Sequence, residues 1–445
     1  MRTRRTGPRP AGGRPPGPRP RTWALVLATV FALLQLANVT GRDTPDSKNY
    51  LSYALSLSGE DKREAAAATI DFVCEGEASV AVRRQRVDVV RFHRADPTPR
   101  ITAECRAREW RTVGARLAAG QTGGHTVPFM PERFMRIFEA RPGYPAFLVP
   151  FLSLFGVTWG LWAAGVVVTA VGGVLAFLVL RALRAPARVR LAGQALYYVL
   201  PCGATAMRPM TEGLMLALTL TAVWGCALAL DGRVRAGAWL VGGALAALFA
   251  VKHSQALFLG LCLAGAAALI AVRRRWRGRP VGRGVAVVAV AGACGVLGTL
   301  LLARHLRYPS ETESLQDLLT HHFSRPDRTR VWPEFWQLQG NFWGEWLRRQ
   351  LWQPLFVAAL AAGAWGAARG PRRAFGLFAA AAAFTGILTQ AGHPDIAIWG
   401  DRLIVQAWLL PVLGVPLLLE SLVRERVALP GLPGRERPDL VHSMR

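Results

Sequence analysis

Long apolar stretches alternate with short arginine-rich segments along most of the chain, and this alternation constrains the fold more than any other feature. A helix needs roughly 20 mostly apolar residues to cross a bilayer. Ten candidate spans are 22–41, 160–181, 189–207, 210–230, 236–251, 254–272, 284–303, 352–368, 373–391 and 402–421. The pattern therefore predicts an all-α polytopic membrane protein with about ten transmembrane helices.

The stretch 236–272 is too long for one span, and only Lys252 and His253 interrupt its apolar pattern. We interpret it as two helices joined by a tight turn. With that turn included, arginine clusters such as "RALRAPARVR" and "RRRWRGRPVGR" fall in alternate loops. Because Lys and Arg favour the cytoplasmic side of a membrane, the sequence predicts a multi-pass protein of the cell membrane with both termini in the cytoplasm.

The overall charge has the same explanation. The chain has 54 Lys and Arg against 28 Asp and Glu, a formal net charge of +26, and 52% hydrophobic residues. A nucleic-acid-binding protein would carry its basic residues along one polar face, whereas here they lie in clusters between apolar runs. We therefore expect the lipid bilayer, and no nucleic acid, as a partner.

Three regions follow from this layout. Residues 1–21 are rich in Pro, Gly and Arg and are expected to form a disordered basic cytoplasmic tail. Residues 22–421 form the transmembrane domain, and residues 422–445 form a second cytoplasmic tail. Within the transmembrane domain, 42–159 and 304–351 are long enough to fold as extracytoplasmic loops, the first of them with mixed secondary structure.

The first of these loops contains Cys74 and Cys105, the two cysteines that lie outside the predicted helices. A pair of cysteines on an oxidising face of the membrane favours a disulfide. Two free thiols are the alternative. Zinc binding is disfavoured because no Cys-x-x-Cys pair or neighbouring pair of histidines completes a site.

Two segments are expected to lie at the membrane interface. The apolar run after "RPGYP" has only about ten residues before Gly156, which is too short to cross. The segment "VWPEFWQLQGNFWGEWLRRQLWQP" carries five tryptophans, several of them on one helical face. Indole rings favour the interface, so a helix is predicted to lie on the outer leaflet here.

The layout and three short motifs resemble the GT-C superfamily of glycosyltransferases that use polyprenyl-phosphate sugars, the group of the protein mannosyltransferases and the aminoarabinose transferases. "DSKNYLSYALSL" is similar to the Asp-x-x-x-Tyr-x-x-x-Ala pattern of the family's first loop. "ARPGYPAFLVPFLSLFG" is similar to its entry to the second helix, and "RPMTEGLMLALTLTAVW" to a middle helix that begins with an acidic residue. The resemblance implies transfer of a sugar to an acceptor hydroxyl on the extracytoplasmic face, for assembly of the cell envelope.

This chemistry needs a base near the acceptor and positive charge near the leaving phosphate. Asp46 matches the family's motif, so the resemblance implies that it is the catalytic base; Asp43 is the second candidate. The alternative is that Asp46 only caps the helix that follows it.

The remaining candidates for substrate binding lie at the outer ends of predicted helices: Arg141, Tyr144, Arg208, Glu212, Lys252, His253 and Arg402. Arg and Lys suit phosphate, and the resemblance implies that Arg402 faces the lipid phosphate. Each candidate also has a plain structural explanation. Arg208 and Glu212 can form an i,i+4 pair, Lys252 can extend from a turn into the interface, and Arg402 can be a solvated junction residue.

No protein-bound cofactor is predicted, since the lipid-linked sugar is a substrate. A divalent metal stays open. His393 and Asp395, with a first-loop histidine such as His125, could hold one, although their spacing matches no known metal motif.

Two other functional classes remain. A transporter would need internal repeats and broken polar helices near the midplane, and no repeat is found in the sequence. A non-enzymatic scaffold of envelope assembly would use the first loop to bind a partner. P-loop, GxSxG and HExxH motifs are absent. The sugar and the acceptor are not defined by the sequence.

Overall fold

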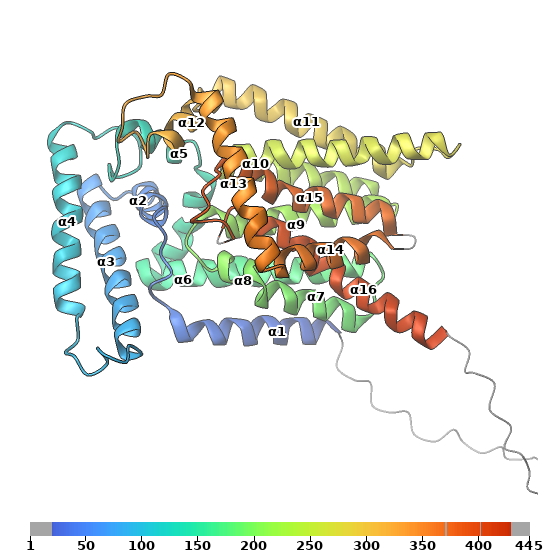
Figure 1. Cartoon of the computed structure of the whole chain (residues 1–445), viewed down its shortest axis with the longest axis horizontal. Coiled ribbons are helices and arrows are strands. Elements are labelled where there is room, and N and C mark those ends of the chain that lie inside the picture. Colours follow the sequence, from blue (N-terminus) through green and yellow to red (C-terminus); the bar gives the residue numbers. More distant parts are fainter. Residues whose placement is uncertain (1–19, 370–371, 401, 429–445) are drawn as a thin grey trace, which may run out of the picture.

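The computed structural model describes residues 20–369, 372–400 and 402–428. The tails expected at 1–21 and 422–445 therefore lie mostly outside the described residues. Every element of the described chain is a helix (Figure 1). The elements are α1 (Pro20–Gln35), η1 (Leu36–Asn38), α2 (Ser47–Leu57), α3 (Lys62–Arg86), α4 (Thr98–Ala118), α5 (Glu132–Glu139), α6 (Gly143–Ala182), α7 (Ala187–Val199), α8 (Pro201–Ala206), α9 (Thr211–Leu230), α10 (Val234–Trp276), α11 (Arg283–His305), α12 (Glu311–Leu319), α13 (Val331–Trp352), α14 (Leu355–Ala368), α15 (Arg373–Gly392), η3 (Val405–Trp408) and α16 (Leu409–Ala428).

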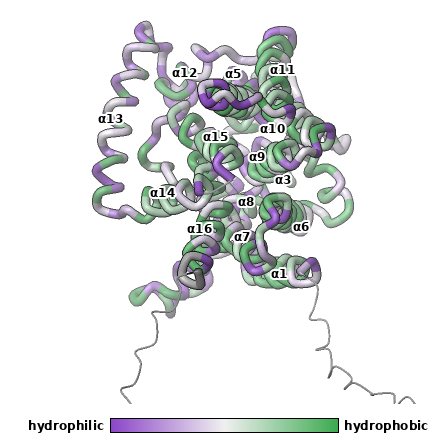
Figure 2. The backbone as a smooth tube through the Cα atoms, turned by 90° about the vertical axis from the view of Figure 1, so that its right-hand side faces the viewer, coloured by the Kyte–Doolittle hydropathy of each residue, from purple (hydrophilic) through white to green (hydrophobic). Residues whose placement is uncertain are grey.

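Apolar helices form one bundle, and α2 to α5 lie at one end of it (Figure 1). We call this end, where α12 also lies, the loop end, and the opposite end the arginine end. Figure 2 views the bundle from the arginine end and shows that its helices are mostly apolar. In the described chain, seven helices are long and apolar enough to cross a membrane, or eight if the bent pair α13 and α14 is one span. The fold is thus all-α with the features of a multi-pass membrane protein, while the count of ten spans stays a prediction.

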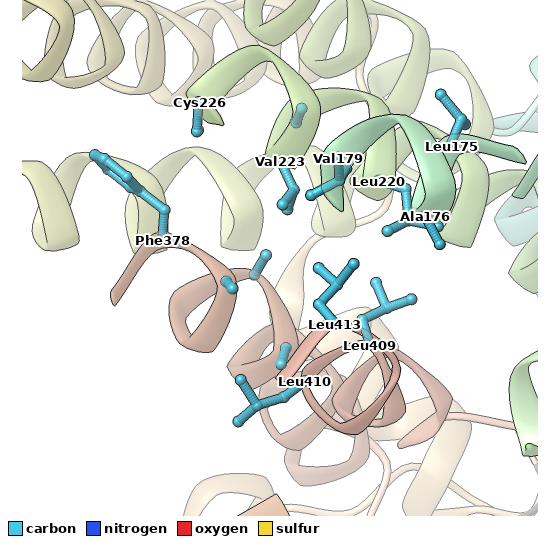
Figure 3. Packing of buried hydrophobic residues seen from close by; sticks show 14 of the residues in the cluster. Leu175, Ala176, Val179, Leu220, Val223, Cys226, Phe378, Leu409, Leu410 and Leu413 are labelled. Carbon is cyan, nitrogen blue, oxygen red and sulfur yellow. The ribbon is translucent and has the colours of Figure 1, made fainter. Parts of the chain in front are cut away.

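The core of the bundle is built from small and branched apolar side chains of helices that are distant in sequence. Figure 3 shows Leu175 and Val179 of α6, Leu220 of α9, Phe378 of α15 and Leu413 of α16 in this cluster. Each of them is less than a tenth exposed. Their packing holds the ends of these helices, and therefore the side chains on them, in fixed positions.

Helix α10 is interrupted at Lys252, whose backbone is extended (φ −164°, ψ 97°). Gly237, in its first half, packs against Ala229 near the end of α9. Arg274, in its second half, approaches Gly282, and Gly284 in turn meets Ala229. Both ends of α10 therefore lie at the arginine end, and the chain reverses near Lys252. Residues 234–251 alone are about 27 Å long at 1.5 Å per residue, which suits the turn predicted there.

Helix α6 contains a second break, at Gly156 (φ 70°, ψ −178°). Only glycine adopts this backbone conformation without strain. The chain bends so sharply that Gly160 contacts the backbone of Phe151 and Leu152. The short apolar helix before Gly156 and the long helix after it are thus separate segments, as the length of the apolar run predicts.

Two expected spans are not continuous helices. In place of a helix over 189–207, α7 ends at Val199 and α8 begins at Pro201, because proline has no N–H and clashes with the preceding turn. In place of a span over 352–368, α13 ends at Trp352, and α14 starts after a bend of 86° and has only 14 residues. Apolar composition was therefore not a sufficient guide to helix length here.

The loop end is all-helical rather than mixed in the described residues, and two links stabilise it. Cys74 of α3 and Cys105 of α4 form a disulfide with their Cα atoms 5.6 Å apart. Arg133 of α5 binds Glu313 and, at 2.7 Å, Asp327, so it connects the two long loops. Trp336 and Trp352 of α13 are exposed, whereas Trp346 packs on the bundle.

Candidate functional site

Side chains from segments far apart in sequence meet at the loop end of the bundle. They come from the start of α2, the junction of α5 and α6, the start of α9, the break in α10 and the residues before η3. Each interacts electrostatically with others of the set. We call this set the charge cluster: Asp46, Tyr50, Arg141, Glu212, Lys252 and Arg402.

The closest contact in the charge cluster joins Asp46 and Arg402. Arg402 Nη1 donates to Asp46 Oδ2 at 2.7 Å, and each side chain is about a fifth exposed (20% and 21%). Asp46 occupies the N-cap position of α2 but makes no capping hydrogen bond with its side chain. Capping therefore does not explain this carboxylate. Its partner is a cation that lies 356 residues away in sequence.

Arg141 lies beside this pair, just before α6. Its Nη1 donates to the hydroxyl of Tyr50 at 3.1 Å. The ring of Tyr50 is buried and meets the ring of Tyr144 edge-on, with centroids 5.4 Å apart. The two motifs that carry the family resemblance in the first loop thus contact each other through Tyr50, Arg141 and Tyr144.

Glu212 and Lys252 form the inner side of the charge cluster. Glu212 is 3% exposed and lies in the first turn of α9, where the helix dipole favours a negative charge. It accepts a hydrogen bond from Thr211 at 3.2 Å and interacts electrostatically with Lys252 and Arg402. A buried carboxylate needs such partners because desolvation penalises its charge. Lys252 is in place because the chain reverses there.

The charges of the two arginines depend on the carboxylates around them. Burial lowers the pKa of Arg402. The opposing effect of Asp46 and Glu212 outweighs burial, so the pKa lies above its ordinary value. Burial likewise lowers the pKa of Arg141, and Tyr50, Asp46 and Glu212 outweigh it. Both guanidinium groups therefore stay charged although little water reaches them.

Both arginines also retain unused hydrogen-bonding capacity. Within the described chain, Nε of Arg141 and Nε of Arg402 are buried donors with no acceptor. Arginine presents its donors as a planar fork that matches the oxygens of a phosphate or a carboxylate. An anionic ligand at the charge cluster would supply the missing acceptors.

A histidine outside the candidates predicted from the sequence lies next to the charge cluster. His322 follows α12, and its Nδ1 is 3.0 Å from Oδ1 of Asp317. This hydrogen bond raises the pKa of His322; burial lowers it, and Asp317 and Asp46 add to the increase. His321, His322 and Phe323 all have positive φ (54°, 59° and 57°), a strained conformation for residues other than glycine. No spacing in the sequence could have revealed this turn.

Several candidates do not join the charge cluster. Asp43 packs against Gly76 of α3, and burial raises its pKa. Arg208 forms no ion pair with Glu212 or with any other described carboxylate, so the pairing considered for it does not occur. His253 interacts with Lys252 and Arg141, but its ring packs against Tyr308, with centroids 5.1 Å apart.

Behind Lys252, a network of amides and hydroxyls connects the bundle helices. Gln255 Nε2 donates to Oε1 of Gln406 at 2.6 Å and to the hydroxyl of Thr385 at 3.0 Å. The Thr389 hydroxyl donates to Gln255 at 3.1 Å. Polar side chains in apolar bundles stabilise helix contacts in this way, and here they fix the turn of α10 relative to η3, close to Arg402.

Within the described residues, no group of three or more His, Cys, Asp and Glu side chains is arranged to hold a metal ion. His393 lies at the end of α15, and His125 stacks on Tyr53 in the first loop, with centroids 5.1 Å apart. Comparison with known proteins adds nothing to this geometry: no protein-family profile, curated protein or solved structure matches the chain.

Proposed function

We propose that the protein is an integral membrane glycosyltransferase, of GT-C type, that transfers a sugar from a polyprenyl-phosphate donor to a hydroxyl group on the extracytoplasmic face. One observation carries this proposal. A carboxylate, Asp46, lies partly buried at the end of a membrane-type bundle together with three partly buried cations, Arg141, Lys252 and Arg402. A lipid-linked sugar phosphate has its reacting bond at this depth, next to the head groups.

The reaction makes one bond and breaks one. The acceptor oxygen attacks the anomeric carbon, and the bond from that carbon to the phosphate oxygen breaks. The proton of the acceptor passes to Asp46, which acts as general base. The phosphate leaves with an added negative charge, which the guanidinium of Arg402 and the ammonium of Lys252 stabilise.

Donor binding explains why Asp46 and Arg402 are paired before the reaction. The phosphate offers Arg402 a bidentate anion, so the guanidinium can move from the carboxylate to the phosphate. Asp46 then becomes free to accept a proton. Arg141, whose Nε has no acceptor among the described residues, binds a further phosphate oxygen.

The decisive experiment compares two neighbouring carboxylates. Removing a general base lowers a rate by about 10²–10⁴. A panel of polyprenyl-phosphate sugars is offered to the purified protein in liposomes. The rate of sugar transfer by Asp46→Asn should be lower than that of the wild type by this factor. Asp43→Asn is the matched control, because Asp43 lies against α3, and it should retain most of the activity. Equal rates for Asp46→Asn and the wild type would contradict the proposal.

A transporter is the second candidate, and the breaks in α6 and α10 are the observation in its favour, because transporters bind their substrates at broken helices. Gly156 and Lys252 lie at the loop end, however, while transport sites lie near the midplane. A scaffold that binds a partner through α2 to α5 would not need the charge cluster. Sugar transfer by the wild type that is abolished in Asp46→Asn would distinguish an enzyme from a transporter and from a scaffold.

The proposal includes ten transmembrane segments and cytoplasmic termini, with α10 crossing twice. The reversal at Lys252 supports the two crossings assigned to α10. Reporter fusions after residues 21 and 428 should report the same, cytoplasmic, side. Opposite sides for the two fusions would require an odd number of crossings.

A further inference from the structure

A cavity in the described part of the chain lies at the arginine end, away from the charge cluster. Its volume is about 810 Å³, within the range of ordinary ligand sites. It opens between the end of α10, the start of α15 and the end of α14. The residues that line it include Leu269, Ile270, Ala364, Ala368, Leu377 and Ala380 on its apolar wall. We call it the arginine-end cavity.

Five arginines complete the lining: Arg273, Arg274, Arg277, Arg279 and Arg373. None of these forms an ion pair with a described carboxylate. The acids of this end have other partners, since Asp231 binds Arg184 at 2.9 Å and Glu420 binds Arg372 at 3.0 Å. The cavity therefore combines a concentrated positive charge with an apolar wall, and among the described residues no carboxylate pairs with its arginines.

The start of α15 adds to the positive potential. Arg373, Ala374, Gly376 and Leu377 of its first turns line the cavity. This helix has no acidic residue in its first turn and no side-chain cap. Its first N–H groups and the positive end of its dipole therefore favour an anion at the same place as the arginines.

We propose that the arginine-end cavity binds an anionic glycerophospholipid. Its phosphodiester lies at the arginines, and the parts of its acyl chains next to the head group pack against α10, α14 and α15. A soluble anion would satisfy the guanidinium groups but would leave the apolar wall in contact with water. A zwitterionic lipid would cover the wall but would bring an ammonium group close to five arginines. Basic pockets between transmembrane helices recognise anionic head groups for these reasons. The inference does not depend on the proposed transferase activity.

The test measures which lipid stays with the purified full-length protein. Protein is equilibrated with equal amounts of dioleoyl phosphatidylglycerol and dioleoyl phosphatidylcholine in nanodiscs, transferred to detergent, and its retained lipid is measured by native mass spectrometry. The wild type should retain phosphatidylglycerol at least fivefold over phosphatidylcholine. The Arg273→Gln/Arg277→Gln/Arg373→Gln variant should lose this preference. Arg181→Gln/Arg188→Gln is the matched control, because both arginines are exposed near the same end but do not line the cavity, and it should behave as the wild type.

A second variant separates lipid binding from charge alone. Ala364→Phe keeps every arginine but places a ring in the apolar part of the cavity, and Ala364 is exposed, so the fold should tolerate it. It should reduce retained phosphatidylglycerol as strongly as the arginine variant. No preference in the wild type, equal losses in the cavity and control variants, or unchanged retention in Ala364→Phe would each overturn the proposal. So would displacement of the lipid by millimolar inorganic phosphate, which would identify the cavity as a site for a soluble anion.

Discussion

The two ends of the bundle are both rich in cations, but the cations have different surroundings. At the loop end, Arg402 and Arg141 are partly buried and lie among the carboxylates of Asp46 and Glu212. At the arginine end, Arg273 and its neighbours lie near the surface and have no described carboxylate as a partner. The net charge of the chain does not distinguish these two arrangements.

The difference indicates what each end can do. Charges that are desolvated and held by opposite charges are preorganised for chemistry, because they need no reorientation when charge develops on a substrate. Solvated arginines beside an apolar wall are suited to orientation in the membrane and to head groups. Partly buried charges with opposite charges beside them therefore mark the candidate active site at the loop end. Exposed arginines without such partners among the described residues mark the arginine end.

Removing one cation from each end should give the largest contrast in stability. Lys252→Met removes the cation that interacts most strongly with the buried Glu212, and removing the charge partner of a buried carboxylate costs up to about 3–5 kcal/mol. We expect about 3 kcal/mol, since Arg402 also interacts with Glu212. Arg275→Met is the control at the arginine end, where an exposed substitution should stay within about 0.5 kcal/mol. Unfolding in the same detergent measures both, and equal losses would break the comparison.

A smaller effect is expected from the pH dependence of the loop end. Asp317 raises the pKa of His322 in the folded protein. The stabilisation is therefore complete below the unfolded pKa of about 6.5 and is lost as the pH rises through the higher folded value. The thermal midpoint of the wild type should fall across this window, and that of His322→Gln should fall less. Asp46 and Arg402 also interact with His322, so a second variant must show that Asp317 is responsible. Asp317→Asn should also reduce the slope of the thermal midpoint against pH. Identical slopes in all three proteins would contradict the assignment.

Local features of the fold could be predicted from the sequence where one residue determines the backbone. The apolar run that ends at Gly156 and the interruption at Lys252 both mark real breaks. Pro201 marks another, which an apolar window over 189–207 conceals. Hydropathy averages over about a turn or more and does not register a single missing N–H.

Contacts between residues far apart in the sequence were harder to predict from the sequence. The motif around Asp46 identified a carboxylate, and the position of Arg402 identified a cation, but their 2.7 Å contact depends on how the whole bundle packs. His322 was missed for the same reason, since its place beside the charge cluster results from a strained turn in the second loop. Asp43 and Arg208 have suitable residue types, but Asp43 packs against Gly76 of α3 and Arg208 forms no ion pair with a described carboxylate.

Binding of the lipid phosphate to the charge cluster tests the central claim most directly. The measurement compares the dissociation constants of a polyprenyl phosphate and of the corresponding polyprenol for the wild type, Arg402→Gln and Asp46→Asn. The wild type should bind the phosphate at least tenfold more tightly than the alcohol, which corresponds to about 1.4 kcal/mol. Arg402→Gln should lose that preference, and Asp46→Asn should keep it, because Asp46 acts on the acceptor. Equal binding of phosphate and alcohol by the wild type, or an unchanged preference in Arg402→Gln, would contradict the account.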